Sequence, residues 1–434
     1  MAAWSAPPAS AQGRRLSLIR DAEIEHIIRS YAEPIFLAAG IRPDAVGIYL
    51  VNDPRLNAFV AGGQNMFFNT GLLIQARGPE EVVGVIAHET GHLAGGHLAR
   101  GQEQIEAARR TALVSALIGV VAAVAAGDAG AGAAVIAGGS TLAERGYLSY
   151  TRGMENAADH AGIRYLASAG YSAEGLLSFL EYLGDQELVG QSRQSEYART
   201  HPLTRDRIDS LRAYVATAEA TGRPLPDAAV EAFGRMQAKL IGFLQPQVAL
   251  QRYAADDDSV AARYARSIAS YRRGDLASAL AGVDRLLAEE PDNPFFHELK
   301  GQMLLEDGRP AESRPSYQRA VTLYPGEPTL LVALAQTKLA SQDPADLESA
   351  IADLKQALDA RGGSTPLAWR LLATAYGRNG DLGMAAVALA EEALVQGDKA
   401  AARQQAQRAL QTLPEGSAGW LRAQDVQRVA EGDG

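Results

Sequence analysis

Cysteine is absent from the 434-residue chain. Disulfide bonds and thiolate metal ligands are therefore excluded, so any metal site must be built from histidines and carboxylates. The absence does not identify a compartment, because a chain without thiols fits a bacterial periplasm and the cytosol equally. Long basic runs are also lacking and the net charge is −10, which argues against nucleic acid as a partner.

Long apolar runs are scarce as well, and residues 111–139 come nearest to one. Residues 111–126 carry no charge, and a Gly/Ala-rich stretch follows them. A membrane span needs about 20 apolar residues; the first run is too short and the second too rich in glycine. We favour a helical hairpin buried over the functional site; the alternative is peripheral contact with a membrane or a hydrophobic substrate.

The N-terminus carries a faint targeting signal. Residues 1–13 are small and Pro-rich, and residues 9–11 (Ala-Ser-Ala) have the pattern of a signal-peptidase site. The basic segment and most of the apolar segment of a signal peptide are missing. We favour a truncated or removed signal peptide over an ordinary flexible terminus, and expect residues 1–20 to be a leader remnant or disordered.

Residues 21–240 are expected to form one domain of mixed helix and strand. An amphipathic helix is predicted over residues 21–39. Short strands are predicted over residues 47–51, 58–60 and 66–69. A further helix begins at Pro79, with Glu80 and Glu81 in the first turn, where the helix dipole favours anions.

His88, Glu89 and His92 form an H-E-x-x-H motif within this last helix. Histidines four residues apart leave the same face of a helix, so both imidazoles can bind one metal ion. Glu89 lies one step round the helix, where its carboxylate can take a proton from a metal-bound water. Glycines at positions 84, 91, 95 and 96 weaken the helix but let other backbones approach it closely. The motif predicts a zinc peptidase site.

Two arrangements compete to complete this metal site. The metzincin pattern, H-E-x-x-H-x-x-G-x-x-H, has its glycine at Gly95, but Leu98 stands where its last histidine should be. His97 is one residue short, and on a continuing helix it would lie about 180° round from His88. We therefore interpret His97 as a partly buried or capping histidine.

The gluzincin arrangement takes a glutamate from a later helix, and Glu155 and Asp159 fit it. They are four residues apart on one helical face, beside alanines that permit close packing. We predict that Glu155 binds the metal, and that Asp159 accepts the free ring N–H of a ligand histidine and fixes its tautomer. Without the H-E-x-x-H motif, both carboxylates would be a solvated acidic face. Other histidines, interpreted as structural, are His26, His160 and His297.

Residues 245–430 contain an internal repeat. Gly274 and Gly308 are 34 residues apart, as are Pro291 and Pro325. Small and aromatic residues recur where the 34-residue tetratricopeptide repeat requires them, at Ala279, Gly301, Tyr317, Ala320, Gly397, Ala402, Ala409 and Pro414. Less regular units surround Trp369 and cover residues 329–365.

This pattern predicts four or five helical pairs, stacked into a solenoid whose concave face binds peptides or proteins. The fold expected for the chain is mainly α: an α+β peptidase domain with a small sheet, followed by an all-α repeat domain.

Together the motifs resemble the HtpX and CAAX-prenyl-protease group of gluzincin metallopeptidases. The resemblance rests on H-E-x-x-H followed by Glu155-x-x-x-Asp159, preceded by Asn-Ala-Phe at residues 57–59 and Gly-Leu-Leu at residues 71–73. The C-terminal repeats and Thr-His-Pro at residues 200–202 are similar to a soluble periplasmic branch, the beta-barrel assembly-enhancing proteases. The transmembrane helices of the HtpX branch are not visible in this sequence.

The resemblance implies a periplasmic endopeptidase with one Zn²⁺ per chain, bound by His88, His92 and Glu155. Its substrates would be misfolded or assembly-stalled envelope proteins. The repeats would bind these substrates or the outer-membrane barrel assembly machinery. Residues 58–60 would form an edge strand that pairs with the substrate backbone.

The resemblance also gives His201 a role. In the family, a histidine of the His-Pro motif lies near the zinc, occupies its open position and lowers activity, and His201 matches this motif. The alternative interpretation is a turn residue before Pro202. Two other functions stay open: a chaperone or scaffold with a silent peptidase site, and a membrane-embedded protease that uses residues 111–139.

Overall fold

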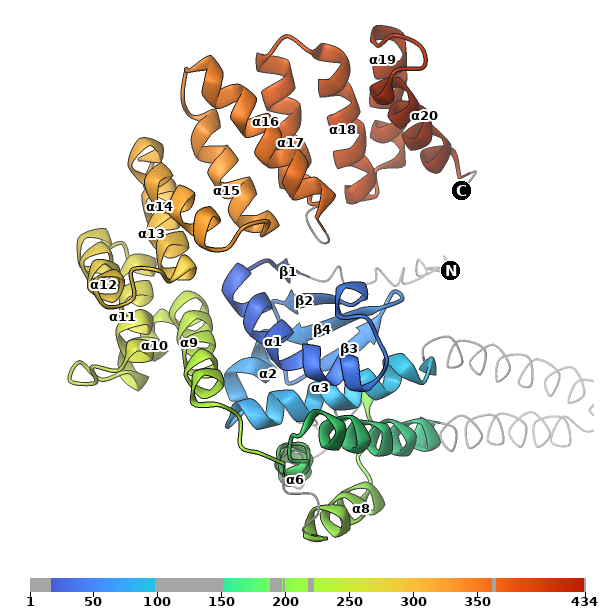
Figure 1. Ribbon diagram of the computed structural model, residues 1–434, viewed down its shortest axis with the longest axis vertical. Helices are drawn as coiled ribbons and strands as arrows, with labels where there is room; N and C mark the ends of the chain where they lie inside the picture. Colours follow the sequence, from blue (N-terminus) through green and yellow to red (C-terminus); the bar gives the residue numbers. More distant parts are fainter. Residues whose placement is uncertain are drawn as a thin grey trace, which may run out of the picture. The chain divides into compact units, whose positions relative to one another are not determined.

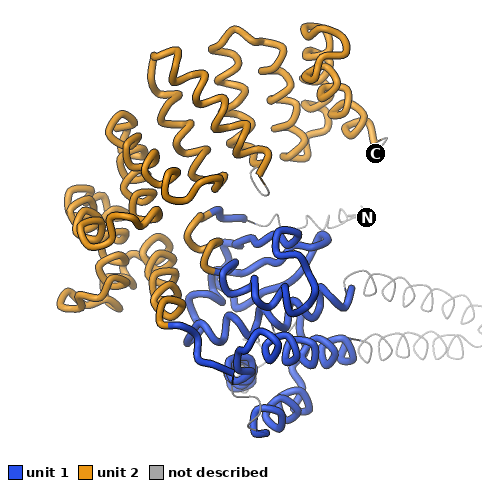
Figure 2. The backbone as a smooth tube through the Cα atoms, viewed as in Figure 1, with its two compact units in different colours: residues 1–20, 28–226 blue, residues 21–27, 227–434 orange. Residues whose placement is uncertain are grey.

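The computed structural model describes residues 17–97, 151–187, 197, 200–217, 222–360 and 364–432. The chain divides into two compact units (Figure 2), unit 1 with residues 1–20 and 28–226, and unit 2 with residues 21–27 and 227–434. The expectation for residues 111–139 lies outside the described residues. Within the described part of the chain, no helix has the length and apolar character that a membrane span requires.

Unit 1 is built around a four-stranded sheet (Figure 1). Its strands are β1 (Leu18–Ile19), β2 (Gly47–Val51), β3 (Ala58–Ala61) and β4 (Asn65–Asn69). Its helices are α1 (Ala22–Ala38, from Ile28 onward), η1 (Pro43–Ala45), α2 (Thr70–Gln75), α3 (Pro79–Ala94), α6 (Glu174–Glu187) and α8 (Arg205–Ala216). A further helix, without a label in Figure 1, covers residues 151–169.

The sheet has the order β1-β2-β4-β3, so the predicted strand at residues 58–60 is an edge strand. β2 and β4 run parallel, whereas β3 is antiparallel to β4 and β1 is antiparallel to β2. On one face Tyr49, Phe67 and Phe59 stack as a row, with ring centroids 5.1 and 5.0 Å apart. Leu18 and Ile19, expected in a leader remnant or disordered segment, instead pair with β2.

Helix α3 is buried around nearly its whole circumference because glycines let neighbouring backbones approach it. A Cβ atom at Gly84 would lie 2.6 Å from the backbone nitrogen of Leu176 in α6. A Cβ atom at Gly91 would lie 2.6 Å from the carbonyl oxygen of Ala158, in the helix over residues 151–169. The predicted close approach is confirmed at these two glycines.

Unit 2 is an array of helices. They are α9 (Asp227–Leu244), α10 (Pro246–Arg252), α11 (Val260–Arg272), α12 (Leu276–Glu289), α13 (Pro294–Glu306), α14 (Pro310–Leu323), α15 (Pro328–Leu339), α16 (Pro344–Asp359), α17 (Pro366–Arg378), α18 (Leu382–Gln396), α19 (Lys399–Thr412) and α20 (Ala418–Glu431). From α11 onward, each helix packs against the next one in sequence.

The repeat pattern of the sequence explains this packing. Gly274 and Gly308 adopt left-handed backbone conformations, with φ of 86° and 78°, in the turns between paired helices. A Cβ atom at Gly301 would lie 2.8 Å from the Tyr317 ring, so the small residue of α13 makes room for the aromatic residue of α14. The predicted fold class, mainly α with a small sheet and helical repeats, is confirmed.

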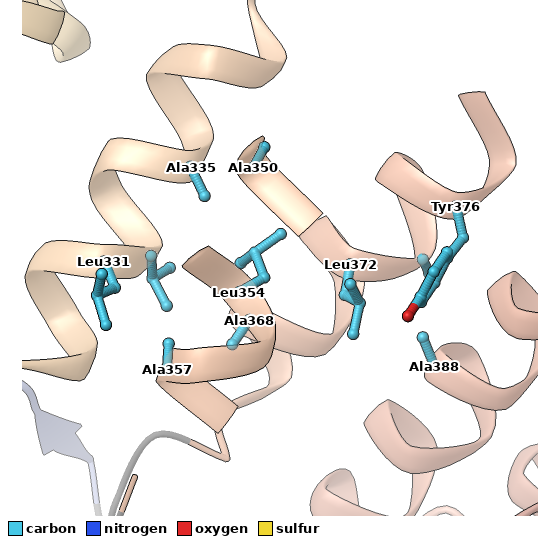
Figure 3. Packing of buried hydrophobic residues seen from close by; sticks show 11 residues of the cluster. Leu331, Ala335, Ala350, Leu354, Ala357, Ala368, Leu372, Tyr376 and Ala388 are labelled. Carbon is cyan, nitrogen blue, oxygen red and sulfur yellow. The ribbon is translucent and has the colours of Figure 1, made fainter. Parts of the chain in front are cut away.

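Large and small side chains alternate in the core of unit 2 (Figure 3). Leu331 and Ala335 of α15 face Ala350 and Leu354 of α16, and Tyr376 of α17 reaches towards α18. Alanines at the crossings let the helices approach closely, and leucines fill the space between them.

The first residues of α1 join a buried charge cluster of unit 2. Lys239 of α9 is buried, and its Nζ lies 3.0 Å from Asp21, 3.4 Å from Glu23 and 3.3 Å from Glu298. The Tyr264 hydroxyl donates a hydrogen bond to Glu23 (2.8 Å). Burial raises the pKa of Glu298 to about 7, although Lys239 opposes this shift.

Candidate metal centre

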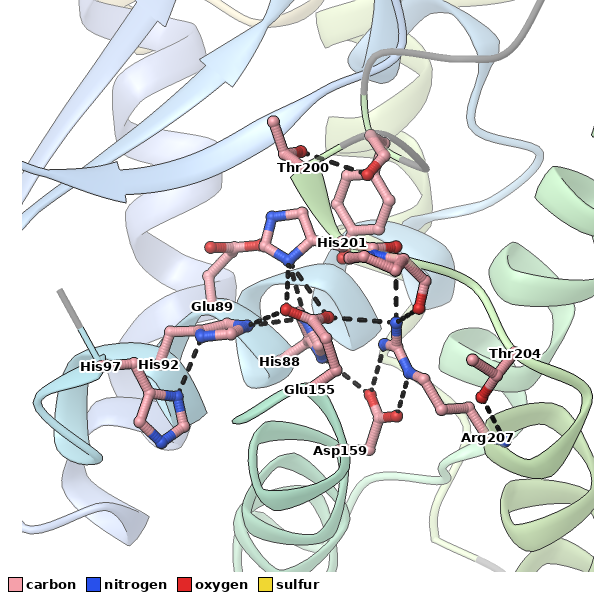
Figure 4. Close-up of polar contacts among 12 residues, drawn as sticks. His88, Glu89, His92, His97, Glu155, Asp159, Thr200, His201, Thr204 and Arg207 are labelled. Atoms are coloured by element: carbon pink, nitrogen blue, oxygen red, sulfur yellow. Dashed lines mark hydrogen bonds and ion pairs between the residues drawn. The ribbon is translucent and has the colours of Figure 1, made fainter. Parts of the chain in front are cut away.

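Three segments of unit 1 bring four potential metal ligands together (Figure 4). His88 and His92 leave the same face of α3, Glu155 points at them from the helix over residues 151–169, and His201 lies before α8. One ligand atom from each side chain lies within 4.8 Å of the other three, and all four side chains are buried. The structure thus places the three predicted ligands and His201 in one cluster.

Four separations among the facing atoms are close to those between the ligands of a bound zinc ion. The Nε2 atoms of His88 and His92 are 3.1 Å apart, and Nδ1 of His201 lies 3.3 Å from Nε2 of His88. Oε1 of Glu155 lies 3.3 Å from Nε2 of His92 and 3.2 Å from Nδ1 of His201. A tetrahedral zinc ion with bonds of about 2.0–2.1 Å has ligand atoms about 3.3–3.4 Å apart.

Hydrogen bonds behind the imidazoles determine which nitrogen faces the cluster. Nδ1 of His88 lies 2.8 Å from Oδ1 of Asp159, so we assign the proton to Nδ1. Nδ1 of His92 lies 2.9 Å from Nδ1 of His97, and the same assignment makes His92 the donor. When both rings are neutral, two Nε2 lone pairs face each other, and either a metal cation or an added proton on His88 satisfies them. The donor set therefore fits a metal ion.

Arg207 completes the cluster and was not predicted from the sequence. Its Nε and Nη2 lie 2.6 and 2.9 Å from the two carboxylate oxygens of Asp159, and its Nη1 lies 3.0 Å from Oε2 of Glu155. Nη1 also donates to the carbonyl of Pro202 (3.1 Å). This buried guanidinium neutralises two carboxylates and holds the chain that follows His201.

Burial and hydrogen bonding separate the pKa values of the cluster. Burial lowers the pKa of His88, but the hydrogen bonds to Asp159 and Glu155 outweigh it and raise the pKa to about 10. Burial lowers the pKa of His92 to about 3. Burial raises the pKa of Asp159, but His88 and Arg207 outweigh it and lower the pKa to about 2. Asp159 is therefore an ionised acceptor at neutral pH.

Glu89 lies beside the four ligand atoms with its carboxylate unpaired. It is fully buried, and neither oxygen has a hydrogen-bond partner among the described residues. Its Oε1 lies 3.5 Å from Nε2 of His201, and burial raises the pKa of its carboxyl. A carboxyl with a raised pKa is a better proton acceptor than an ordinary glutamate, as a general base requires.

Tyr197 and Arg207 hold His201 over the cluster. The Tyr197 ring stacks on the imidazole with centroids 4.5 Å apart, and the backbone N–H of His201 donates to the Tyr197 carbonyl (2.7 Å). Nη1 of Arg207 lies 3.5 Å from the His201 carbonyl oxygen. His201 thereby places Nδ1 beside Nε2 of His88 and Oε1 of Glu155.

The three histidines interpreted as structural lie outside this cluster. Nδ1 of His160 donates to the carbonyl of Asn156 in its own helix (2.7 Å), and Nε2 of His297 donates to the carbonyl of Pro291 (2.9 Å). His26 belongs to unit 2, where its Nδ1 lies 3.1 Å from the Tyr324 hydroxyl.

Comparisons with known proteins identify similar families for both parts of the chain. Residues 19–215 match peptidase family M48, and residues 264–328 and 333–400 match the tetratricopeptide repeat. The beta-barrel assembly-enhancing protease of Yersinia pestis is 27% identical over 314 residues, which cover 68% of this chain and 61% of that protein. The protein of the same name from Escherichia coli (strain K12) is 26% identical over 335 residues, covering 75% and 67%.

A further similarity covers a shorter part of the chain. The mitochondrial metalloendopeptidase OMA1 of Arabidopsis thaliana is 31% identical over 170 residues, which cover 38% of this chain and 30% of that protein. The chain spans 61% of the length of the Yersinia relative, so it corresponds to only part of that protein. The family resemblance inferred from the motifs is confirmed.

Proposed function

Because the chain joins a domain of peptidase family M48 to tetratricopeptide repeats, we propose that it is a zinc metalloendopeptidase. One observation carries the proposal: the converging ligand atoms of His88, His92 and Glu155, with the unpaired carboxylate of Glu89 beside them. These are the parts that hydrolysis of a peptide bond by a metal-activated water requires.

His88, His92 and Glu155 would hold the zinc, and Asp159 and Arg207 would keep two of these ligands in place. When bound, zinc supplies a Lewis acid that acidifies water and stabilises negative charge on the substrate oxygen. Glu89 takes the proton of the attacking water at its carboxylate and passes it to the leaving amine.

His201 would regulate access to this site. Its Nδ1 lies 3.3 Å from Nε2 of His88 and 3.2 Å from Oε1 of Glu155, where it would compete with the attacking water for the zinc. Basal proteolysis would therefore be slow, because the segment with His201 must move away before the water can bind. We expect His201→Ala to raise basal proteolysis; unchanged or abolished proteolysis would contradict the gating role.

The substrates proposed are misfolded or assembly-stalled envelope proteins of the periplasm. This part of the proposal is supported by the name of the bacterial relatives, beta-barrel assembly-enhancing protease, and by the repeats, since tetratricopeptide arrays bind peptides and proteins. The repeats would recruit these substrates or the outer-membrane barrel assembly machinery. The edge strand β3 would bind an extended substrate by strand addition.

A second candidate function is a chaperone or scaffold with a latent peptidase site. The position of His201 among the ligand atoms favours it, because a histidine bound to the zinc there would keep the attacking water out. The repeats would then hold client proteins without cleaving them. The two functions can coexist in one protein.

Glu89→Gln distinguishes the two functions. The full chain is loaded with zinc, and the degradation of a chemically unfolded protein is followed by gel electrophoresis, with a chelator as control. We expect the unmodified chain to cleave, and Glu89→Gln to retain zinc and client binding but lose cleavage by roughly 10²-fold or more. Cleavage by Glu89→Gln at the unmodified rate would contradict the mechanism. Client binding without cleavage by either chain would favour the chaperone function.

A further inference from the structure

Helix α3 ends at Ala94, three residues before His97. Gly95 is the C-terminal cap, and Gly96 adopts the left-handed conformation with φ of 60°, which turns the chain away from the helical path. The expectation that His97 lies on the far side of a continuing helix is therefore wrong. The turn instead brings His97 back towards His92.

The imidazole of His97 lies directly behind a candidate metal ligand. Its Nδ1 is 2.9 Å from Nδ1 of His92, the two rings meet edge to face at 80°, and only 9% of His97 is exposed. Gly95 makes room for this contact, since a Cβ atom there would lie 2.5 Å from Nε2 of His97. In the Gly-Gly-His sequence at residues 95–97, Gly96 thus provides the turn, Gly95 the space and His97 the side chain of this contact.

We propose that His97 is a positioning residue that orients His92 towards the metal, an inference that rests on the proposed metal site. His97 accepts the Nδ1–H of His92 at its own Nδ1. This hydrogen bond selects the tautomer of His92 whose Nε2 lone pair points into the cluster, and it restrains rotation of the ring. His97 is not itself a ligand, since the four converging atoms come from other residues.

The two ligand histidines therefore have different acceptors behind them. His88 donates to the ionised carboxylate of Asp159, whereas His92 donates to the imidazole of His97. A carboxylate draws the ring proton more strongly, so His88 is the more electron-rich ligand and His92 the weaker one. Loss of the acceptor behind His92 should consequently reduce metal affinity without removing the site.

The zinc affinity of the full chain tests this role. The metal is removed with a chelator, and affinity is measured by competition with a chromophoric zinc chelator at one pH. We expect His97→Ala to weaken zinc binding by roughly 10–100-fold. Gly95→Ala should weaken it similarly, because the new methyl group displaces the His97 ring. His97→Asn should recover most of the affinity, because its Oδ1 stands where histidine has the accepting Nδ1.

His160→Ala is the matched control. His160 is exposed, lies on the helix that carries Glu155, and bonds only to the backbone of its own helix through Nδ1, so its variant should bind zinc as the unmodified chain does. Circular dichroism melts of every variant separate a loss of folding from a loss of affinity. Zinc binding by folded His97→Ala within 2-fold of the unmodified chain would overturn the positioning role. An unmodified chain that binds no zinc would contradict the proposed function, and this role with it.

Discussion

Replacing Gly91 by alanine tests whether the close contact of two helices holds the candidate metal centre together. Gly91 lies in α3 between Glu89 and His92, and a Cβ atom there would be 2.6 Å from the carbonyl oxygen of Ala158 and 2.9 Å from its Cα. Non-bonded carbon atoms prefer separations of about 3.5–4.0 Å. The two helices must therefore move apart by roughly 1 Å at this crossing.

The expected effect combines two opposing contributions to the free energy of unfolding. Overpacking costs about 1–3 kcal/mol, and the better helix propensity of alanine returns up to about 1 kcal/mol. Glu155 lies on the same helix as Ala158, so the separation also draws its carboxylate away from His88 and His92. A misplacement of this size lowers catalysis by roughly 10²-fold, and zinc affinity should fall with it.

Gly153→Ala is the matched control for this prediction. Gly153 is exposed on the helix that carries Glu155, and nothing lies within 4 Å of a Cβ atom built there. Its replacement should stabilise the protein by about 0.5–1 kcal/mol and leave zinc binding unchanged. Urea denaturation of the metal-free proteins and zinc competition measure both quantities. If Gly91→Ala were stabilised like Gly153→Ala and kept full zinc affinity, the two backbones would not be in contact as described.

Two further predictions concern the buried charges. Arg207→Met leaves the carboxylates of Asp159 and Glu155 buried without their cation, so we expect urea denaturation to show a loss of about 3–5 kcal/mol; a loss below about 1 kcal/mol would contradict the bridging role. Glu298 is ordinarily protonated below pH 4.5, and its pKa in the folded protein is raised to about 7. Between pH 4.5 and 7 the folded state therefore keeps a proton that the unfolded state has released. The stabilisation that this proton gives the folded state is complete below pH 4.5 and is lost as the pH rises through 7. Glu298→Gln should reduce the fall in melting temperature between pH 5 and 8, and an unchanged pH profile would argue against the shift.

Most of the fold could be predicted because its signals are local. The apolar run at residues 48–51 and the proline at position 79 mark elements within a few residues of sequence, and the structure has them at the same places. The exception is β1, where Leu18 and Ile19 form a strand by pairing with Leu50 and Val51. A two-residue strand has no periodicity of its own, and its partner lies more than thirty positions away.

The residues of the candidate site also differ in whether a local sequence signal predicts them. Motif spacing was enough to select His88, His92 and Glu155. Arg207 carried no such signal, because it is one of several arginines on a polar helix and its partners come from two other segments. His97 did carry a signal: the two glycines before it end a helix, which excludes the continuing helix on which its expected position depended.

The central claim, that His88, His92 and Glu155 hold a catalytic zinc, is tested most directly by anomalous X-ray diffraction at the zinc edge. The measurement uses a crystal of the zinc-loaded full chain. We expect one zinc peak per chain, about 2.0–2.1 Å from Nε2 of both histidines and bonded to the carboxylate of Glu155. No peak among these three side chains, or a zinc ion bound by other residues, would contradict the claim.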